Sequence, residues 1–407
     1  RVMSPPGWPG FPTPLNLNKV QRYIRFIKSL KVINRIWKDY FLMNKKIQIT
    51  AITGAIIFSI FVLTSPDNET SIPLPQPNSY SENNSVIILA ENLDKPRAIA
   101  VSDNRIFVTE KDGYIRVIEN NILLESPLAT FRTVNVFDGG LLGITVHPNF
   151  SNNHLLYVFL TYEENGNLWN KILQITEEEN KLKDVKVILD KIPGSSFTNG
   201  GFLKFGPDKK LYVGTGTVSD ASHLPQDINS LSGKILRLND DGTIPSDNPF
   251  PNSYVYSLGH RHPQGMTWDD SGNLFVAEFG PEKNDEINLI KAGKNYGWPE
   301  QECSGNIDFE NALLCYDPSI EPGGILFYSG DKIDFESKFI MASMRASNLY
   351  QVDFEEGLSS QKSILSGNGR IRDVVEGSDG SLYVITSNTD GKGFPDGLDD
   401  RLLRILK

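Results

Sequence analysis

Cysteine and histidine are scarce in this sequence. Its 407 residues include two cysteines and five histidines, and two cysteines are too few for a zinc or iron–sulfur site built on thiolates. The sequence contains no H-E-x-x-H, no G-x-S-x-G and no glycine-rich phosphate loop. The signals of zinc hydrolysis, serine hydrolysis and nucleotide chemistry are therefore missing. Long stretches of helical periodicity are missing as well, which favours a fold made of strands.

The chain as a whole has fewer basic than acidic residues, 40 against 50. The formal net charge is −10, which argues against nucleic acid as a partner. Residues 1–46 nevertheless hold ten Lys or Arg and one acidic residue, so the remainder holds 30 basic and 49 acidic residues. This acidic body suits an exported, soluble domain.

The two cysteines, Cys303 and Cys315, lie twelve residues apart in a loop-like segment. If the domain is exported, we expect them to form a disulfide, because disulfides persist in oxidising compartments. The alternative is a pair of free thiols.

The first part of the chain resembles a targeting region. Residues 1–42 form a basic extension, either unstructured or helical. Met43 begins an export-type segment, in which Lys45-Lys46 precede 17 uncharged residues, Ile47–Leu63. That length is at the lower limit of a membrane span, and the basic side should stay inside. We expect residues 43–64 to be an uncleaved membrane anchor, which would place the part of the chain that follows it in the periplasm or outside the cell. If the segment is instead a cleaved signal, the protein is secreted.

Residues 65–84 are polar and proline-rich, as in a flexible linker, and the chain then repeats itself from 85 to 407. A short strand of the form L-Y-V recurs at spacings of 50, 55, 63, 65 and 43 residues. Its six copies are Ile106–Val108, Leu156–Val158, Leu211–Val213, Leu274–Val276, Phe339–Met341 and Leu382–Val384. Further strands flank most copies, so each unit predicts a four-stranded antiparallel sheet.

Six such units predict an all-β fold, a six-bladed β-propeller. A four-stranded sheet cannot bury both faces alone, and packing six sheets around one axis solves that problem. Val86–Leu89 could close the ring by joining the last blade. A pair of β-sandwiches is the alternative.

The segment from Val255 to Trp298 carries the densest set of candidate functional residues. A Ser271-Gly272-Asn273 turn separates two apolar runs, which predicts a hairpin. Arg261 and His262 precede the first strand, and Gly280-Pro281 follow the second. A guanidinium and an imidazole beside bare turn carbonyls could hold an anionic cofactor and a hard metal ion.

Arginines recur at comparable places in successive units. Arg261 precedes the fourth L-Y-V strand, Arg345 follows the fifth, and Arg370 and Arg372 precede the sixth. Such positions can converge near a propeller axis, and guanidinium groups favour carboxylates. The alternative is that they are surface arginines with local partners.

The histidines offer fewer candidates. His147 and His154 lie in a turn between strands, where a structural role is favoured. His260 and His262 flank Arg261 and alternate in side, so we expect only one of the two to face a site.

The chain from about Ser85 to Lys407 resembles the soluble quinoprotein aldose sugar dehydrogenases, the glucose/sorbosone dehydrogenase family. The motifs that carry the resemblance are G-G-L-L-G-I-T-V-H-P-N-F, G-K-I-L-R-L-N-D-D-G-T-I-P-S-D-N-P-F, G-H-R-H-P-Q-G, E-F-G-P with D-E-I-N-L-I and N-Y-G-W-P, and G-R-I-R-D-V. The resemblance implies a six-bladed propeller that binds pyrroloquinoline quinone (PQQ) and calcium on one face.

The resemblance also implies roles for single residues. Arg261 would lie against cofactor and substrate, and Arg345, Arg370 and Arg372 would bind the carboxylates of PQQ. Asn199 would also bind the cofactor. The backbone carbonyls of Gly280 and Pro281 would coordinate the cofactor's Ca²⁺, and Glu286 and Tyr296 would bind a second, structural Ca²⁺.

The sequence departs from the family at the catalytic base. Thr198 stands where the family has its histidine, and Thr217 stands where the family has the aspartate that orients it. Because threonine is no base near neutral pH, we expect either impaired catalysis or a relocated base. His262 is the candidate for that base, and His223 is a weaker one.

These observations predict PQQ- and Ca²⁺-dependent oxidation of an aldose sugar or related alcohol, followed by electron transfer to an external acceptor. The alternatives are a catalytically inactive propeller that binds a sugar or glycan, and a calcium-dependent hydrolase of the lactonase type.

Overall fold

The computed structural model describes residues 85–102, 104–134, 136–218, 221, 223–335, 338–354 and 361–406. The extension predicted for 1–42, the anchor for 43–64 and the linker for 65–84 lie outside these residues. Within the described part of the chain, no helix has both the length and the apolar composition needed to cross a membrane.

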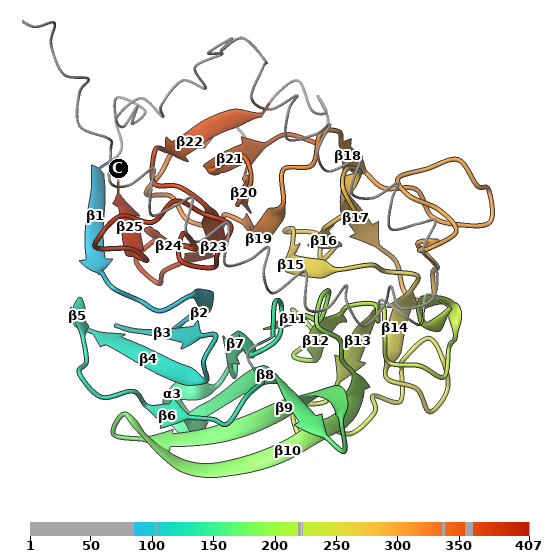
Figure 1. Cartoon of the computed structure of the whole chain (residues 1–407), viewed down its shortest axis with the longest axis horizontal. Coiled ribbons are helices and arrows are strands. Elements are labelled where there is room, and N and C mark those ends of the chain that lie inside the picture. Colours follow the sequence, from blue (N-terminus) through green and yellow to red (C-terminus); the bar gives the residue numbers. More distant parts are fainter. Residues whose placement is uncertain are drawn as a thin grey trace, which may run out of the picture. The chain divides into compact units, whose positions relative to one another are not determined.

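Six antiparallel sheets surround a central axis (Figure 1). We call them blades 1 to 6. Blade 1 contains β2 (Pro96–Ser102), β3 (Arg105–Glu110), β4 (Tyr114–Glu119) and β5 (Ile122–Leu123), with β6 (Ala129–Thr130) paired to β4; blade 2 contains β7 (Leu141–Val146), β8 (Leu155–Glu164), β9 (Asn167–Glu178) and β10 (Lys181–Pro193). Blade 3 contains β11 (Gly200–Phe205), β12 (Leu211–Thr215), β13 (Lys234–Leu238) and β14 (Val255–Leu258); blade 4 contains β15 (Pro263–Trp268), β16 (Leu274–Glu278), β17 (Asp285–Ile290) and β18 (Leu314–Tyr316). Blade 5 contains β19 (Pro322–Phe327), β20 (Phe339–Ser343), β21 (Asn348–Val352) and β22 (Lys362–Ser366); blade 6 contains β23 (Ile371–Glu376), β24 (Leu382–Thr386), β25 (Leu402–Leu406) and β1 (Ser85–Ala90). The short helices are α3 (Phe150–Asn153) and η1 (Leu224–Gln226).

The predicted strand repeat is confirmed. The six L-Y-V segments lie in β3, β8, β12, β16, β20 and β24, the second strand of each blade. The predicted hairpin is present too, with Trp268 opposite Leu274. Its turn forms because the Asp269 carboxylate accepts the backbone N–H groups of Ser271 and Asn273, while Gly272 adopts a φ of 81°.

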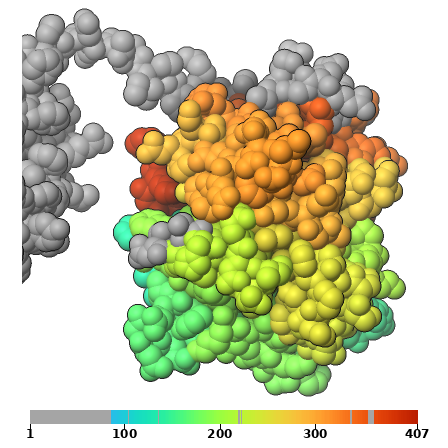
Figure 2. Space-filling model, turned by 90° about the vertical axis from the view of Figure 1, so that its right-hand side faces the viewer, coloured from blue at the N-terminus to red at the C-terminus, as the bar shows by residue number. Residues whose placement is uncertain are grey.

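The ring closes as predicted. β1 pairs with β25, so the first strand of the described chain completes the last blade. The innermost strands β2, β7, β11, β15, β19 and β23 contact one another in a closed circle. The alternative of two β-sandwiches is therefore wrong. In Figure 2 the colours pass from green through yellow to orange along the side of the domain, as expected for blades that follow one another in chain order.

The core consists of six apolar clusters, one between each pair of neighbouring blades. The cluster between blades 1 and 2, for example, contains the fully buried Phe107 and Leu156. Each blade thus buries both of its faces against neighbours, which is the reason why the repeat needs the ring.

Every innermost strand carries a bulge near its first residue. A bulge leaves a residue unpaired and redirects its side chain. All six bulges lie near the first residue of an innermost strand, and so at the same end of the axis. At this end, side chains that would pack between two blades in a regular strand can point toward the axis instead.

Candidate functional site: a cationic cavity at the propeller axis

A cavity opens beside the first residues of β2, β15 and β23. Its lining includes six basic and two acidic side chains: Lys95, Arg97, Lys111, Arg370, Arg372 and Lys392, with Asp138 and Asp390. The other lining residues are Phe137, His262, Gln264, Phe279, Met344 and Ser387. We call this space the cationic cavity. Its excess of positive charge suits an anionic ligand.

Arg372 is a buried cation without a carboxylate partner. Its Nη2 donates to Gln264 Oε1 at 3.1 Å and its Nη1 to Met344 Sδ at 2.9 Å. Its buried Nε has no partner among the described residues. Burial, followed by repulsion from Arg97, lowers the pKa of Arg372 to about 9. A buried guanidinium with an unused donor beside a cavity is an anion-binding group.

Two of the predicted cofactor-binding arginines, Arg370 and Arg345, share one carboxylate. Glu321 accepts from Arg370 Nη2 at 2.9 Å and from Arg345 Nη2 at 3.0 Å. Arg370 also contacts Asp390 at 3.2 Å. Arg370 lines the cationic cavity, whereas Arg345 is 51% exposed and does not. Their predicted contacts with a cofactor stay predictions.

Arg261 lies in a small neighbouring cavity that shares Phe279 with the cationic one. Its Nη1 donates to the carbonyls of Phe279 and Gly280, at 2.9 and 2.5 Å. Its guanidinium also stacks on Trp298, 5.3 Å from the ring centre. The structure thus brings Arg261 beside Arg372's cavity without placing it in the lining.

His262 faces the cationic cavity, as we expected of one histidine in this segment. Its Nε2 lies 2.9 Å from the amide nitrogen of Gln264, and the Gly200 N–H approaches its Nδ1 at 3.3 Å. A neutral imidazole has a single acceptor nitrogen, so only one of these contacts is a full hydrogen bond. Burial lowers the pKa of His262 to about 3, and the charge of Arg261 acts in the same direction. The ring is therefore neutral near pH 7.

His260 belongs to a different, fully buried network. Its Nε2 lies 2.8 Å from Ser257 Oγ and its Nδ1 lies 3.0 Å from Glu278 Oε1. This order of groups matches a nucleophile–base–acid triad, but Ser257 and His260 have no exposed surface and Glu278 has 2%. No substrate can reach them. Glu278 instead accepts the backbone N–H of Arg261 at 3.0 Å, which fixes the turn that carries Arg261.

The two threonines at the family's acid–base positions are neighbours. Thr198 precedes β11, Thr217 follows β12, and the hydroxyl of Thr198 donates to the Thr217 carbonyl at 2.8 Å. The fold therefore brings these two positions together, but neither side chain is a base near neutral pH.

Asn199 and His223 do not reach the cationic cavity. The Asn199 amide donates to the Ser195 carbonyl at 2.7 Å and accepts from the Ser195 N–H at 3.0 Å, so it holds its own loop together. His223 is exposed and precedes η1. A role for Asn199 in cofactor binding stays a prediction.

The predicted calcium ligands surround the second cavity. Its lining includes Gly280, Pro281, Glu286 and Tyr296. The Tyr296 hydroxyl donates to the Leu289 carbonyl at 2.6 Å, which leaves only its backbone oxygen for a metal. Burial, and then the negative charge of Glu278, raises the pKa of Glu286 to about 7. In the described part of the chain, no three His, Cys, Asp or Glu side chains gather as a metal site.

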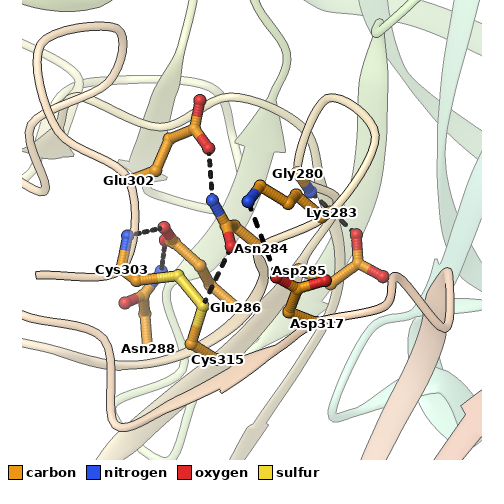
Figure 3. The surroundings of a disulfide bond; sticks show 10 residues. All are labelled: Gly280, Lys283, Asn284, Asp285, Glu286, Asn288, Glu302, Cys303, Cys315 and Asp317. Carbon is orange, nitrogen blue, oxygen red and sulfur yellow. Dashed lines mark hydrogen bonds and ion pairs between the residues drawn. A yellow bond between two sulfur atoms is a disulfide. The ribbon is translucent and has the colours of Figure 1, made fainter.

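The predicted disulfide is confirmed. Cys303 and Cys315 are bonded, with their Cα atoms 5.7 Å apart, beside the second cavity (Figure 3). The Cys303 N–H donates to Glu286 Oε1 at 2.6 Å, and Cys315 lies opposite Glu286 in the β17–β18 pair. The disulfide thus fixes both segments that position Glu286.

Of the residues that line the cavity, only His262, Arg370 and Arg372 were candidates from the sequence; those missed include Arg97, Lys111 and Asp138. Asp138 directly precedes the first motif of the family resemblance. Arg97 has the same place in blade 1 as Arg372 in blade 6, since each is the unpaired residue of its strand's bulge. Alignment of the six repeats could have revealed Arg97.

Known proteins of one family are similar to this chain. A family model described as glucose/sorbosone dehydrogenase matches residues 93–404. Quinoprotein glucose dehydrogenase B of Acinetobacter calcoaceticus is 36% identical, over 76% of this chain and 87% of its own length. An aldose sugar dehydrogenase of Escherichia coli is 30% identical, over 75% of this chain and 91% of its own.

A solved structure has the same fold. The PQQ-bound aldose sugar dehydrogenase of Streptomyces coelicolor superposes with a TM-score of 0.71 at 33% identity, covering 82% of this chain and 99% of that one.

Proposed function

The chain belongs to the glucose/sorbosone dehydrogenase family, and from this premise we propose that it oxidises an aldose sugar or related alcohol with PQQ and Ca²⁺. It is an oxidoreductase that would pass the electrons to an external acceptor. The observation that carries the proposal is the buried guanidinium of Arg372 in the cationic cavity, which has only neutral partners and whose Nε has no partner among the described residues. PQQ is a tricarboxylate, and carboxylates are the anions that guanidinium groups bind best.

The fit to PQQ rests on the donors that line the cavity. Arg372 and Arg370 would bind its carboxylates from blade 6. When bound, PQQ supplies a quinone that accepts a hydride from the substrate carbon. The buried position of Arg372 holds its guanidinium in place before the ligand arrives, which reduces the cost of ordering it.

The fit to Ca²⁺ rests on backbone oxygens, a ligand type that calcium accepts readily. Gly280 and Pro281 would supply them. The Gly280 carbonyl already accepts from Arg261, so the ion and this guanidinium compete for one oxygen. Arg261 would stay beside the ion through its second contact, the Phe279 carbonyl, and the family resemblance implies that it lies there against cofactor and substrate.

The proton acceptor is proposed to be His262, since Thr198 and Thr217 cannot serve. Gln264 must first release His262 Nε2. Asp138 lies in the same cavity, and its carboxylate accepts no hydrogen bond from the described residues. It would stabilise the imidazolium that forms, as the carboxylate of a catalytic triad does. Burial is the main cause of the low pKa of His262, and the cationic groups that lower this pKa further are the ones that a tricarboxylate would neutralise.

Reconstitution tests the proposal. The purified protein, loaded with PQQ and Ca²⁺, is mixed with a panel of aldoses while the quinone absorbance and reduction of an artificial acceptor are followed. Sugar-dependent reduction supports the dehydrogenase. The absence of PQQ uptake would reject it.

A second candidate is a catalytically silent propeller that binds a sugar or glycan. The hydrogen bond between Thr198 and Thr217 favours it, because the usual base and its partner are both replaced. Uptake of PQQ without reduction by any sugar would support this candidate, whereas hydrolysis of a lactone without PQQ would support a hydrolase.

We also propose that the propeller lies outside the cytoplasm, attached to the membrane through residues 43–64. The disulfide supports an oxidising compartment. Fractionation of cells tests this: the protein should remain with membranes after a high-salt wash, and recovery in the cytosolic fraction would reject it.

A further inference from the structure

Arg97 lies where the cationic cavity meets a second, small pocket between the innermost strands. Among the described residues, three line both spaces: Arg97, Gln264 and Arg372. Each of the three is the unpaired residue of the bulge at the start of its innermost strand, in blades 1, 4 and 6. The bulges therefore aim these side chains at one place.

Two of these three side chains are guanidinium groups on adjacent blades. β2 and β23 contact each other across the seam where the ring closes. Burial lowers the pKa of Arg97, and Arg97 in turn is the first charged group that lowers the pKa of Arg372. Two cations thus lie close enough to repel each other at the floor of one cavity.

Arg97 has no partner for its charge. Its guanidinium forms no hydrogen bond or ion pair with the residues that the structure describes, although Asp138 and Asp390 line the same cavity. Arg372 has only the neutral Gln264 and Met344. Lys111 nearby donates only to the Phe137 carbonyl, at 2.5 Å. Half-buried and buried cations with no anion between them are a costly arrangement unless a ligand supplies the anion.

We propose that Arg97 and Arg372 together bind one carboxylate of the cofactor, with Lys111 adding positive charge from blade 1. This inference rests on the proposed PQQ-dependent function and extends it to the wall of the cavity that blade 1 forms. The family resemblance placed the carboxylate-binding arginines in blades 5 and 6, whereas here blade 1 would contribute as well.

The test is a titration of the purified full-length protein with PQQ in the presence of Ca²⁺, followed by quenching of tryptophan fluorescence. Arg97→Gln keeps most of the side-chain volume and removes the charge. Hydrogen bonds to charged groups are worth about 1.5–3 kcal/mol, so Kd should rise roughly 10- to 100-fold. Arg404→Gln is the matched control, because Arg404 lies on β25, pairs with Asp379 and lines neither space.

Thermal unfolding without PQQ supplies a second measurement. Because Arg97→Gln removes repulsion from a neighbouring cation, the cofactor-free variant should melt at the same temperature as the parent or higher. Added PQQ should raise its melting temperature less than that of the parent. A drop in cofactor-free stability with unchanged affinity would show that Arg97 has a structural role and would overturn the inference.

A double-mutant cycle separates one shared carboxylate from two independent contacts. If Arg97 and Arg372 bind the same group, the losses in affinity of Arg97→Gln and Arg372→Gln should not add in the double variant. Additive losses would assign the two arginines to different carboxylates and overturn the shared site. If the parent protein binds no PQQ at all, the proposed function fails together with this inference; if the parent binds and Arg97→Gln binds equally well, only the inference fails.

Discussion

At the scale of single residues, the cationic cavity is defined by charges that lack opposite charges. Arg370 is neutralised by Glu321 and Asp390, whereas Arg372 and Arg97 are not neutralised by any described carboxylate at hydrogen-bonding distance. Proteins keep such groups where a ligand completes them. Arg97 and Arg372 therefore have the charge most available to a ligand, whereas Arg370 would share its charge between a ligand and its two carboxylate partners.

The relocated base gives the first prediction at this scale. Replacing His262 by Gln should lower turnover with the best aldose by about 10²–10⁴, the usual worth of a general base, because no other neutral imidazole lines the cavity. Affinity for PQQ should change only a few-fold. His223→Gln is the control, since His223 is exposed. Equal turnover in His262→Gln and parent enzyme would remove His262 from the mechanism.

The low pKa of His262 gives a second prediction, on the stability of the cofactor-free protein. Burial lowers this pKa to about 3, against about 6.5 in the unfolded chain. The unfolded state therefore binds a proton that the folded state does not, between about pH 3 and pH 6.5. The contribution of neutral His262 to the free energy of unfolding is complete above about pH 6.5. It is lost as the pH falls below that value, by up to about 1.4 kcal/mol per pH unit.

Urea unfolding at a series of pH values checks this prediction. The free energy of unfolding of His262→Gln should fall less steeply than that of the parent between pH 6.5 and 4.5. His223→Gln should follow the parent. Parallel curves for His262→Gln and the parent would show that His262 titrates normally.

At the scale of elements, the closing strand β1 determines whether blade 6 is complete. β1 covers β25, and its Val86, Leu89 and Ala90 pack in the clusters on either side of blade 6. Removing residues 1–90 should expose the edge of β25 and cost about 3 kcal/mol or more, since each buried aliphatic side chain contributes about 1.5–3 kcal/mol. Removing residues 1–84 keeps β1 and is the control. Denaturant unfolding measures both, and equal stability would show that the ring does not depend on β1.

The loop between Cys303 and Cys315 is the second element to test. Replacing both cysteines by serine opens a loop of about a dozen residues, which should lower the free energy of unfolding by about 2–3 kcal/mol. The change should also loosen Glu286, which accepts the Cys303 N–H, so the stabilisation gained from added Ca²⁺ should shrink. Denaturation with and without Ca²⁺ measures both effects. An unchanged calcium effect would separate the disulfide from the proposed ion site.

The elements themselves could be predicted from the sequence because their signals are local. The alternation in Leu382–Val384 or Leu211–Val213 reports a strand regardless of what lies next to it. The turn at Gly272 is equally local. Bulges are different, because a bulge depends on the register of a partner strand. The direction of Arg97 and Gln264 therefore could not be derived from their own segments.

At the scale of the whole molecule, ring closure creates the site. Blades 1 and 6 are far apart in the chain, yet β2 and β23 are neighbours, and so Arg97 faces Arg372. The sequence reading found arginines only in blades 4 to 6, where the family motifs are strongest. The resemblance also implied a cofactor-binding role for Asn199, which stays a prediction; in the structure its amide bonds with Ser195.

The central proposal is that this propeller is an active quinoprotein sugar dehydrogenase in which His262 serves as the base in place of the histidine that the family has at the position of Thr198. The most direct measurement is a stopped-flow record of the absorbance of protein-bound PQQ after mixing with aldoses. The account predicts reduction of the quinone by at least one aldose, and reduction about 10²–10⁴ times slower in His262→Gln. A parent protein that binds PQQ tightly but leaves it oxidised with every aldose would contradict the account.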